Sequence, residues 1–261
     1  LNDEAVRIAV KELKKAAKGA EDGTMKKLDK LTSAQRVVGY ISTADRFADR
    51  IVQLKGPAAL VKALVSVYDM PESKTGRIEC LTAGVEACGL LAGKVAASEY
   101  RGAVPVVLNL LPELRSPACL VCIDRFAHDD SNIGKVVSMG TIPEILAMIK
   151  ESGDDPLIAR PAFGALATLA KHQAACDAIN AAYGADVTRD WLTYNLGDEK
   201  QEAAAVSALE LLAALGADEK AGAALCADLR DTGALDNILA AIFESSRKPP
   251  PNLIAAALAL A

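Results

Sequence analysis

Aromatic residues are scarce in this 261-residue chain, where they make up 4% of the sequence and include a single Trp. Alanine, by contrast, accounts for about a fifth of the chain. A composition poor in aromatic and β-branched residues and rich in Ala and Leu favours helix over sheet. Apolar residues still make up 51% of the sequence, which excludes a disordered chain. The composition also excludes a collagen-like chain and a disulfide scaffold.

The chain has no basic excess, because 29 Lys and Arg stand against 34 Asp and Glu, for a net charge of -5. A nucleic-acid-binding protein usually carries a basic excess or a basic stripe, so we expect no nucleic-acid partner. One group of lysines comes closest to such a stripe, but acidic residues surround it, and we interpret it as a solvated helix face. The group consists of Lys11, Lys14, Lys15 and Lys18.

Cysteine is also infrequent, with six residues that all lie in apolar surroundings rich in Ala and Leu. This setting is typical of buried, reduced thiols, so we expect a reducing compartment, with the cytoplasm as the default and the nucleus as the alternative. No run of 18 apolar residues predicts a membrane span, and no signal peptide opens the chain. The sequence starts without Met and stops inside a strongly helical stretch, so we expect it to be a segment of a longer protein.

Catalytic signatures are missing as well. Neither a phosphate-binding glycine loop nor a Gly-x-Ser-x-Gly nucleophile motif occurs. Cys119-x-x-Cys122 could indicate redox chemistry or half of a metal site, but no second pair lies near it, and packing is the favoured interpretation. His128-Asp129-Asp130 is interpreted as a polar helix end, and Asp154-Asp155 before Pro156 as a helix cap. We therefore expect no catalytic, cofactor-binding or metal-binding residues, no cofactor and no small-molecule substrate.

What the sequence does contain is an internal repeat. Gly102-Ala103-Val104-Pro105 matches Gly140-Thr141-Ile142-Pro143, and Gly56, Gly184 and Gly233 begin degenerate copies. Their spacing falls within the scatter of a helical repeat of roughly 40–47 residues. In this motif, Gly ends one helix in a left-handed conformation, and the Pro of the fuller copies fits the first turn of the next helix.

Two further patterns share this period. Polar breaks follow each glycine corner, as at residues 71–74, 112–117, 152–156, 197–200 and 244–251. An Ala/Leu-rich helical stretch then follows each break, as in residues 162–170, 204–213 and 253–261. The small residues of these stretches let helices of neighbouring repeats approach closely, while Leu at helical spacing fills the seam. Each unit is therefore predicted to contain a short helix, a middle helix and a long third helix.

A three-helix unit with Gly-Ala-Ile-Pro-like corners resembles the armadillo repeat family, from about Thr24 to the end of the chain. Two-helix HEAT repeats are the structural alternative. The resemblance implies an all-α, right-handed superhelix with about four complete three-helix repeats and a partial repeat at both ends. We expect one solenoid domain over residues 1–261, in which residues 1–23 form an N-terminal helix or partial repeat and residues 24–261 form the repeats.

In armadillo proteins the third helices line a concave groove that binds segments of partners. The nuclear-import receptors of the family carry Trp and, four residues later, Asn on these helices, but the aligned positions here lack that array. Trp191 and Asn195 have the right spacing but are predicted on a middle helix, and Trp191 with Tyr194 is more typical of core than of a surface anchor. The predicted groove residues are Glu86, Arg125, Thr168 and Ser207, with Glu79, Asp124, His128, His172 and Glu210 near them.

The resemblance and the missing catalytic motifs predict a non-catalytic scaffold or adaptor that binds a partner protein along its groove. The mixture of charges in that groove argues against a simple polybasic ligand. Two alternatives stay open. The chain could be a structural subunit of a larger assembly, including a cytoskeletal one, or a regulatory module beside a catalytic domain.

Overall fold

The computed structural model describes residues 2–23, 28–92, 94, 97–196, 198–218, 221–244, 251 and 254. Over these residues the chain forms fifteen α-helices and one short 3-10 helix, with no β-strand. The all-α class predicted from composition and repeats is therefore confirmed. The helices group into two compact units, residues 1–132 and residues 133–261.

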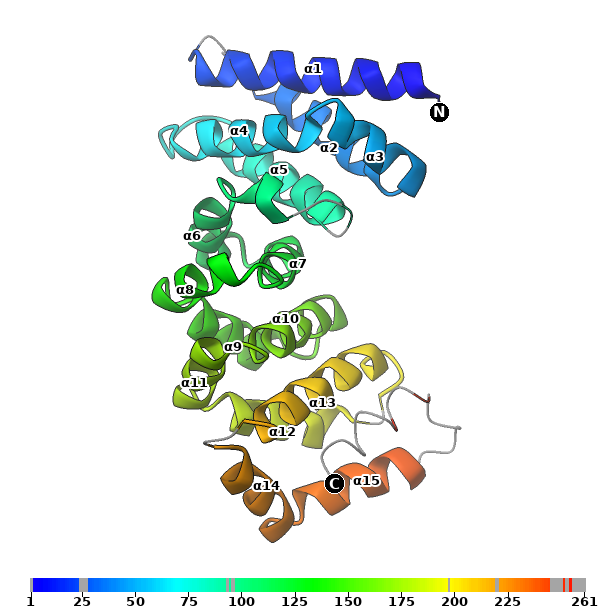
Figure 1. Ribbon diagram of the computed structural model, residues 1–261, viewed down its shortest axis with the longest axis vertical. Helices are drawn as coiled ribbons and strands as arrows, with labels where there is room; N and C mark the ends of the chain where they lie inside the picture. Colours follow the sequence, from blue (N-terminus) through cyan, green and yellow to red (C-terminus); the bar gives the residue numbers. More distant parts are fainter. Residues whose placement is uncertain are drawn as a thin grey trace. The chain divides into compact units, whose positions relative to one another are not determined.

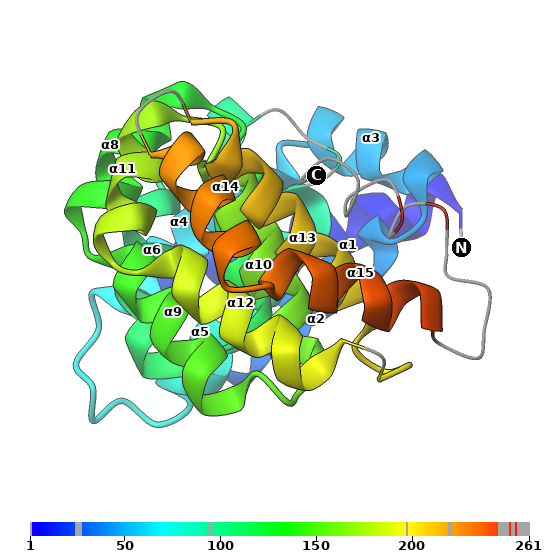
Figure 2. The ribbon, with the colours of Figure 1, turned by 90° about the horizontal axis from the view of Figure 1, so that it is seen from below.

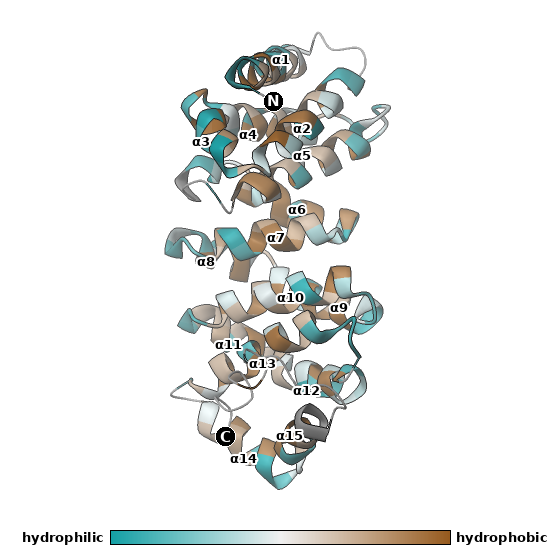
Figure 3. Ribbon diagram, turned by 90° about the vertical axis from the view of Figure 1, so that its right-hand side faces the viewer, coloured by the Kyte–Doolittle hydropathy of each residue, from teal (hydrophilic) through white to brown (hydrophobic). Residues whose placement is uncertain are grey.

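Unit 1 contains the helices drawn from blue to green in Figure 1. Helix α5 packs against α2 on one side and against α7 on the other. Helix α4 packs against α5, and α6 packs against α7. Hydrophobic residues line α6, whereas the short α3 is largely hydrophilic (Figure 3). The elements are α1 (Asp3–Glu21), α2 (Asp29–Ser42), α3 (Asp45–Gln53), α4 (Gly56–Tyr68), α5 (Arg77–Ala92), η1 (Ala97–Tyr100), α6 (Val104–Leu114) and α7 (Pro117–Phe126).

Unit 2 repeats the same order of short, middle and long helices. Helix α10 packs along α13, and α9 lies beside α12 (Figure 2). The elements are α8 (Asp130–Ser138), which starts just before the unit boundary, α9 (Thr141–Ser152), α10 (Pro156–Leu169), α11 (Gln173–Ala181), α12 (Gly184–Asn195), α13 (Glu202–Gly216), α14 (Gly222–Asp231) and α15 (Ala234–Glu244).

Four complete three-element repeats follow from this order. They run from α3 to α5, from η1 to α7, from α8 to α10 and from α11 to α13. Helices α1 and α2 precede the first repeat, and α14 and α15 follow the last. The core consists of the facing sides of these helices, filled by Leu, Ile, Val and Ala, with Tyr100, Phe126 and Phe163 as its largest fully buried side chains.

The glycine corners differ in detail from the prediction. Gly140 and Gly233 adopt the left-handed conformation, with φ of 70° and 68°. Gly102 does not, but a Cβ there would lie 2.9 Å from Cγ1 of Val61, so close packing accounts for that glycine. Only some of the corners therefore need glycine for its backbone freedom.

At Gly184 the left-handed residue is the one before it, Tyr183, with φ of 60°. The glycine is needed because a Cβ would overlap the Ile179 side chain and lie 3.0 Å from the Ile179 carbonyl oxygen. The expectation that this glycine itself is left-handed was wrong, because the tight approach to Ile179 decides the residue type. The same arrangement occurs at Gly56, with Lys55 left-handed and Ile51 in close approach.

The N-terminal expectations hold in outline. Asn2 caps α1, since its Oδ1 accepts a hydrogen bond from the Ala5 amide at 3.0 Å. The helix continues to Glu21, within the stretch 1–23 predicted as an N-terminal helix or partial repeat. Helix α2 follows, and residues 24–27 lie outside the described part. The lysine-bearing side of α1 is exposed, as a solvated face should be.

The features predicted for the later repeats can be compared with the structure only over the residues that it describes. The segment before the Gly233 corner contains the short helix α14. Asp155 caps α10, because its Oδ1 accepts a hydrogen bond from the Leu157 amide at 2.9 Å. Most of the polar break at 244–251 and nearly all of the final Ala/Leu stretch lie outside the described residues.

A membrane crossing requires a helix that is both long and apolar. Among the described residues, no single helix meets both requirements. Helices α3 and α4 reach the required length and composition only when taken together, and they are bent by 74° relative to each other.

Candidate protein-binding surface

The third helix of each repeat carries the residues predicted to bind a partner. In unit 1 these are α5 and α7, and α2 occupies the equivalent place before the first complete repeat. In unit 2 they are α10 and α13. Each of these helices buries one side in the core and leaves a narrow strip open to solvent.

Small residues bring α2 and α5 together. A Cβ added at Gly39 would lie 3.1 Å from the Cα of Ala87 and 3.4 Å from Cδ1 of Leu90. The backbones therefore approach closely, as expected for a stripe of small residues in a helix seam. This contact also places Leu90 of α5 beside the α2 backbone at Gly39.

Exposed apolar side chains gather on this pair of helices. Tyr40 is 72% exposed, and Val37 and Leu90 are also exposed. Val37 and Tyr40 are three residues apart, so they share one side of α2. Of the nine large exposed apolar residues in the described chain, five lie on the third helices α5 and α10 or on α2.

Charged groups border the apolar residues. Nη2 of Arg36 in α2 lies 3.1 Å from Oε1 of Glu79 in α5, and both side chains are exposed. Glu86 lies seven residues after Glu79, on the same side of α5, and is exposed as well. Together these residues form what we call the unit 1 face, which consists of Arg36, Val37, Tyr40, Glu79, Glu86 and Leu90.

Helix α7 continues the series within unit 1. Arg125 and His128 are exposed, and Asp124 is half-buried, with its Oδ2 3.7 Å from Nε of Arg125. A Cβ added at Gly89 of α5 would lie 3.6 Å from Cγ1 of Val121, so the seam between α5 and α7 is also closed by a small residue. The predicted residues of unit 1 are thus accessible or half-accessible.

Unit 2 offers less surface at the predicted positions. Glu210 of α13 is exposed, whereas Ser207 is half-buried and its hydroxyl donates to the Ala203 carbonyl at 3.4 Å. Thr168 of α10 is only 9% exposed, and His172, just after that helix, is half-buried. Thr168 therefore presents almost no side chain to a partner.

Sequence reasoning missed three members of the unit 1 face on α2. Arg36, Val37 and Tyr40 were not predicted, because the segment before the first glycine corner was not aligned with the later third helices. The available signal was their spacing, which places them opposite the buried residues Leu31 and Val38.

The Trp191 and Asn195 pair lies on the middle helix α12, as predicted. Trp191 is 6% exposed, and the Asn195 amide donates to the Trp191 carbonyl at 2.9 Å. The predicted pairing of Trp191 with Tyr194 in the core is half right, because Tyr194 is 86% exposed.

The thiols show no sign of a reactive site. Cys119 and Cys122 are completely buried, and the Cys122 thiol donates to the Val85 carbonyl at 3.5 Å. Burial raises the pKa of the Cys119 thiol to about 12, which suppresses the reactive thiolate. Over the described residues, no group of three or more His, Cys, Asp or Glu side chains is placed to hold a metal ion.

The His128-Asp129-Asp130 segment forms a helix start. The Asp129 carboxylate accepts hydrogen bonds from the Ser131 amide at 3.0 Å and from the Ser131 hydroxyl at 2.7 Å. These hydrogen bonds lower the pKa of Asp129. The carboxylate therefore belongs to the first turn of α8, as expected for a polar helix end.

No protein-family model matches the chain, and no curated protein is significantly similar in sequence. Solved structures match well. An engineered protein from a structural genomics consortium superposes with a TM-score of 0.70 at 20% identity, over 100% of this chain and 95% of that one. A designed armadillo repeat protein in complex with a (KR)4 peptide gives a TM-score of 0.67 at 16% identity, over 95% and 98% of the two chains.

A structure described by the interaction between cadherin and β-catenin also matches, with a TM-score of 0.70 at 18% identity. The match covers 94% of this chain and 44% of the matched chain. Identities at this level establish the architecture alone. The repeat order, the close-packed third helices and these superpositions agree, and the chain has the fold of an armadillo-like solenoid.

Proposed function

We propose that this chain is a non-catalytic protein-interaction scaffold whose third helices bind a segment of a partner protein. The observation that carries the proposal is the accessible apolar surface of Val37, Tyr40 and Leu90 on α2 and α5, the two helices that the Arg36–Glu79 ion pair joins. Apolar side chains with a charged border are typical of a protein-binding surface.

Two structural neighbours support the same use of the fold. One is a designed armadillo repeat protein bound to a peptide, and the other comes from the interaction between cadherin and β-catenin. The unit 1 face carries charges of both signs, so we propose a partner segment with apolar side chains rather than a polybasic one. In unit 1, Asp124, Arg125 and His128 extend this surface. In unit 2, His172, Ser207 and Glu210 offer a smaller one.

We also propose a reducing compartment, the cytoplasm or the nucleus, for this scaffold. All six cysteines are free thiols, and five of them are buried. Disulfides are rare in reducing compartments, where buried thiols act as small apolar side chains.

The test is selection from a displayed peptide library on the intact chain, followed by affinity measurements with the enriched peptides. The face variant carries Tyr40→Ala and Leu90→Ala. Tyr40 is 72% exposed and Leu90 is 45% exposed, so the two truncations remove accessible apolar surface. The control variant carries Lys15→Ala and Lys18→Ala on the exposed side of α1. Circular dichroism and thermal midpoints establish that both variants fold.

We expect the face variant to bind the selected peptides at least about tenfold more weakly, because hot-spot truncations commonly cost more than ~1 kcal/mol each. The control variant should bind within about twofold of wild type. Selection of no peptide, or equal binding by the face variant and wild type, would contradict the proposal.

A further inference from the structure

A second surface lies in unit 2, on middle helices rather than third helices. The end of α9 and one side of α12 enclose a cavity of about 690 Å³. Figure 2 shows these two helices as neighbours. The cavity shares no residue with the unit 1 face, so a ligand site there is independent of the proposed scaffold function.

Two aspartates, with a tyrosine before and after them, line this cavity from α12 and the residue that precedes it. Tyr183, Asp186, Asp190 and Tyr194 follow one another at intervals of three, four and four residues. This spacing places Asp186, Asp190 and Tyr194 on one side of α12, and Tyr183, the residue before the helix, lines the same cavity. Tyr183 is 71% exposed and Tyr194 is 86% exposed, so neither tyrosine is used to fill the core.

The floor of the cavity is apolar and rigid. The Trp191 indole N–H donates to the Gly153 carbonyl oxygen at 2.7 Å, which ties α12 to the end of α9. The indole also packs edge-on against Phe163, with ring centroids 4.8 Å apart. Val187 and Ile149 complete the floor and are buried.

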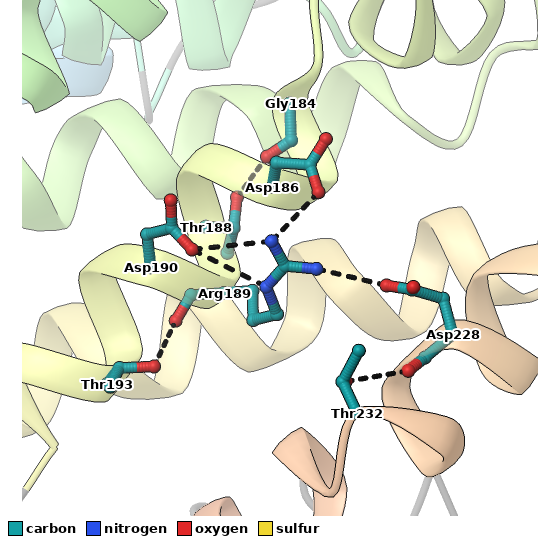
Figure 4. A network of polar contacts seen from close by, with 8 residues as sticks. All are labelled: Gly184, Asp186, Thr188, Arg189, Asp190, Thr193, Asp228 and Thr232. Atoms are coloured by element: carbon teal, nitrogen blue, oxygen red, sulfur yellow. Dashed lines mark hydrogen bonds and ion pairs between the residues drawn. The ribbon is translucent and has the colours of Figure 1, made fainter.

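Arg189 fixes the two carboxylates of this stripe (Figure 4). Its Nη2 lies 3.0 Å from Oδ1 of Asp186 and 3.4 Å from Oδ1 of Asp190, and its Nη1 lies 3.0 Å from Oδ2 of Asp228 in α14. Three carboxylates thus share one guanidinium, so the network keeps a negative charge. The described contacts leave Oδ2 of Asp186 and Oδ2 of Asp190 without a partner.

The α9 end of the cavity adds to the negative charge. Glu151 and Asp154 contribute carboxylates there, and Lys150 contributes one ammonium. Acidic groups therefore outnumber basic ones around the cavity even when Arg189 is included. A phosphate-bearing ligand would be repelled from this site, whereas a cation would be attracted.

We propose that this cavity is a docking site for an arginine side chain carried by a basic segment of a partner protein. The guanidinium is planar, so it stacks on the exposed ring of Tyr194 or Tyr183. Its N–H groups then donate to the open oxygens of Asp186 and Asp190. The aliphatic part of the arginine covers the apolar floor above Trp191.

The experiment uses the intact chain and three synthetic peptides that differ at one position. Each is an uncharged Gly/Ser peptide, capped at both ends, with a central arginine, lysine or citrulline. Citrulline has nearly the shape of arginine but carries no charge. Trp191 is the only Trp of the chain and lines the cavity, so its fluorescence reports occupancy directly. Calorimetry provides a second readout.

We expect the arginine peptide to bind most tightly, the lysine peptide more weakly and the citrulline peptide not measurably. Tyr194→Ala should weaken arginine binding about three- to fivefold, and adding Asp190→Asn should bring the loss to about tenfold. Ile8→Ala removes an exposed apolar side chain from α1, outside both proposed surfaces, and should leave the affinity unchanged.

Equal binding of the citrulline peptide would overturn the proposal, as would equal binding of the lysine peptide or equal losses for Tyr194→Ala and Ile8→Ala. Sedimentation tests a competing occupant. Self-association of the chain that Tyr194→Ala abolishes would show that a second copy, and not a basic segment, covers this cavity.

Discussion

The ammonium of Lys94 lies 2.7 Å from Oδ1 of Asp45, and this ion pair links the segment after α5 to the start of α3. The same Nζ donates to the carbonyl oxygens of Ser42 and Thr43, each at 2.9 Å, at the end of α2. Lys94 therefore satisfies terminal carbonyl groups of one helix and a carboxylate at the first residue of the next.

This arrangement predicts a pH effect. The hydrogen bond from Lys94, together with its charge, holds the pKa of Asp45 below its ordinary value of 3.8. A carboxyl with a depressed pKa stabilises the fold above its unfolded pKa, and that contribution is lost as the pH falls through the folded pKa. Lys94→Met should raise the pKa of Asp45 toward 3.8, which carboxyl-carbon NMR titration measures.

Asp129 is the internal control for that titration. Its pKa is lowered chiefly by hydrogen bonds from Ser131, so Lys94→Met should not move it. A variant in which Asp45 keeps its depressed pKa would show that Lys94 is not the cause.

Gly153→Ala should destabilise unit 2 by about 1–3 kcal/mol. A Cβ at this position would lie 2.8 Å from two atoms of the Trp191 ring and would overlap the Ile149 carbonyl oxygen. The ring would have to move away from the Gly153 carbonyl to which it donates. Urea denaturation followed by Trp191 fluorescence measures both the stability and the changed surroundings of the indole.

Gly164→Ala provides the contrast to that substitution. Gly164 lies inside α10, and a Cβ there would meet nothing within 4 Å. Alanine should therefore stabilise the helix by about 0.5–1 kcal/mol. If Gly164→Ala lost as much stability as Gly153→Ala, the contact with Trp191 would not be the reason that Gly153→Ala destabilises unit 2.

The repeats could be predicted from sequence because Gly, Pro and apolar spacing act locally, within one helix and its neighbour. Which of Trp191 and Tyr194 is buried could not be predicted from sequence. They lie three residues apart on α12, yet the indole enters the space left by Gly153, far away in sequence, while the phenol stays exposed. Which member of such a pair is buried depends on packing between repeats.

The same reasoning applies to the candidate surfaces. The exposure of Glu79, Glu86 and Arg125 could be predicted because polar residues on a helix with an apolar core side face solvent. Tyr40 was missed, and Thr168 proved nearly buried, because accessibility on a third helix depends on the helices beside it.

The first glycine corner predicts opposite effects for two adjacent substitutions. Lys55 is exposed and adopts φ of 56°, so Lys55→Gly should stabilise the chain by about 0.5–1 kcal/mol through relief of left-handed strain. Gly56→Ala should destabilise it by about 1–3 kcal/mol, because a Cβ would overlap the Ile51 side chain. Thermal unfolding of both variants measures the two effects. Stabilisation by both substitutions would show that Gly56 is needed for neither packing nor conformation.

The thiols should react in two classes. Burial raises the pKa of the Cys80 thiol to about 11 and that of the Cys88 thiol to about 12, from an ordinary value of 9.0. At pH 8 this lowers the thiolate fraction of Cys88 about 1000-fold relative to an exposed cysteine. Cys226 is only half-buried, so a disulfide reagent should modify it first, and Cys226→Ser should abolish the fast phase.

The five buried cysteines form the slow class. They should react only as the chain opens, because a reagent cannot reach a thiol whose whole side chain is buried. Its rate should therefore rise with urea in step with unfolding measured by circular dichroism. Fast modification of Cys119 or Cys122 in the folded Cys226→Ser protein would contradict the packing role assigned to that pair. It would instead indicate that the helix seam between α5 and α7, where the Cys122 thiol donates to the Val85 carbonyl, opens independently of the rest of unit 1.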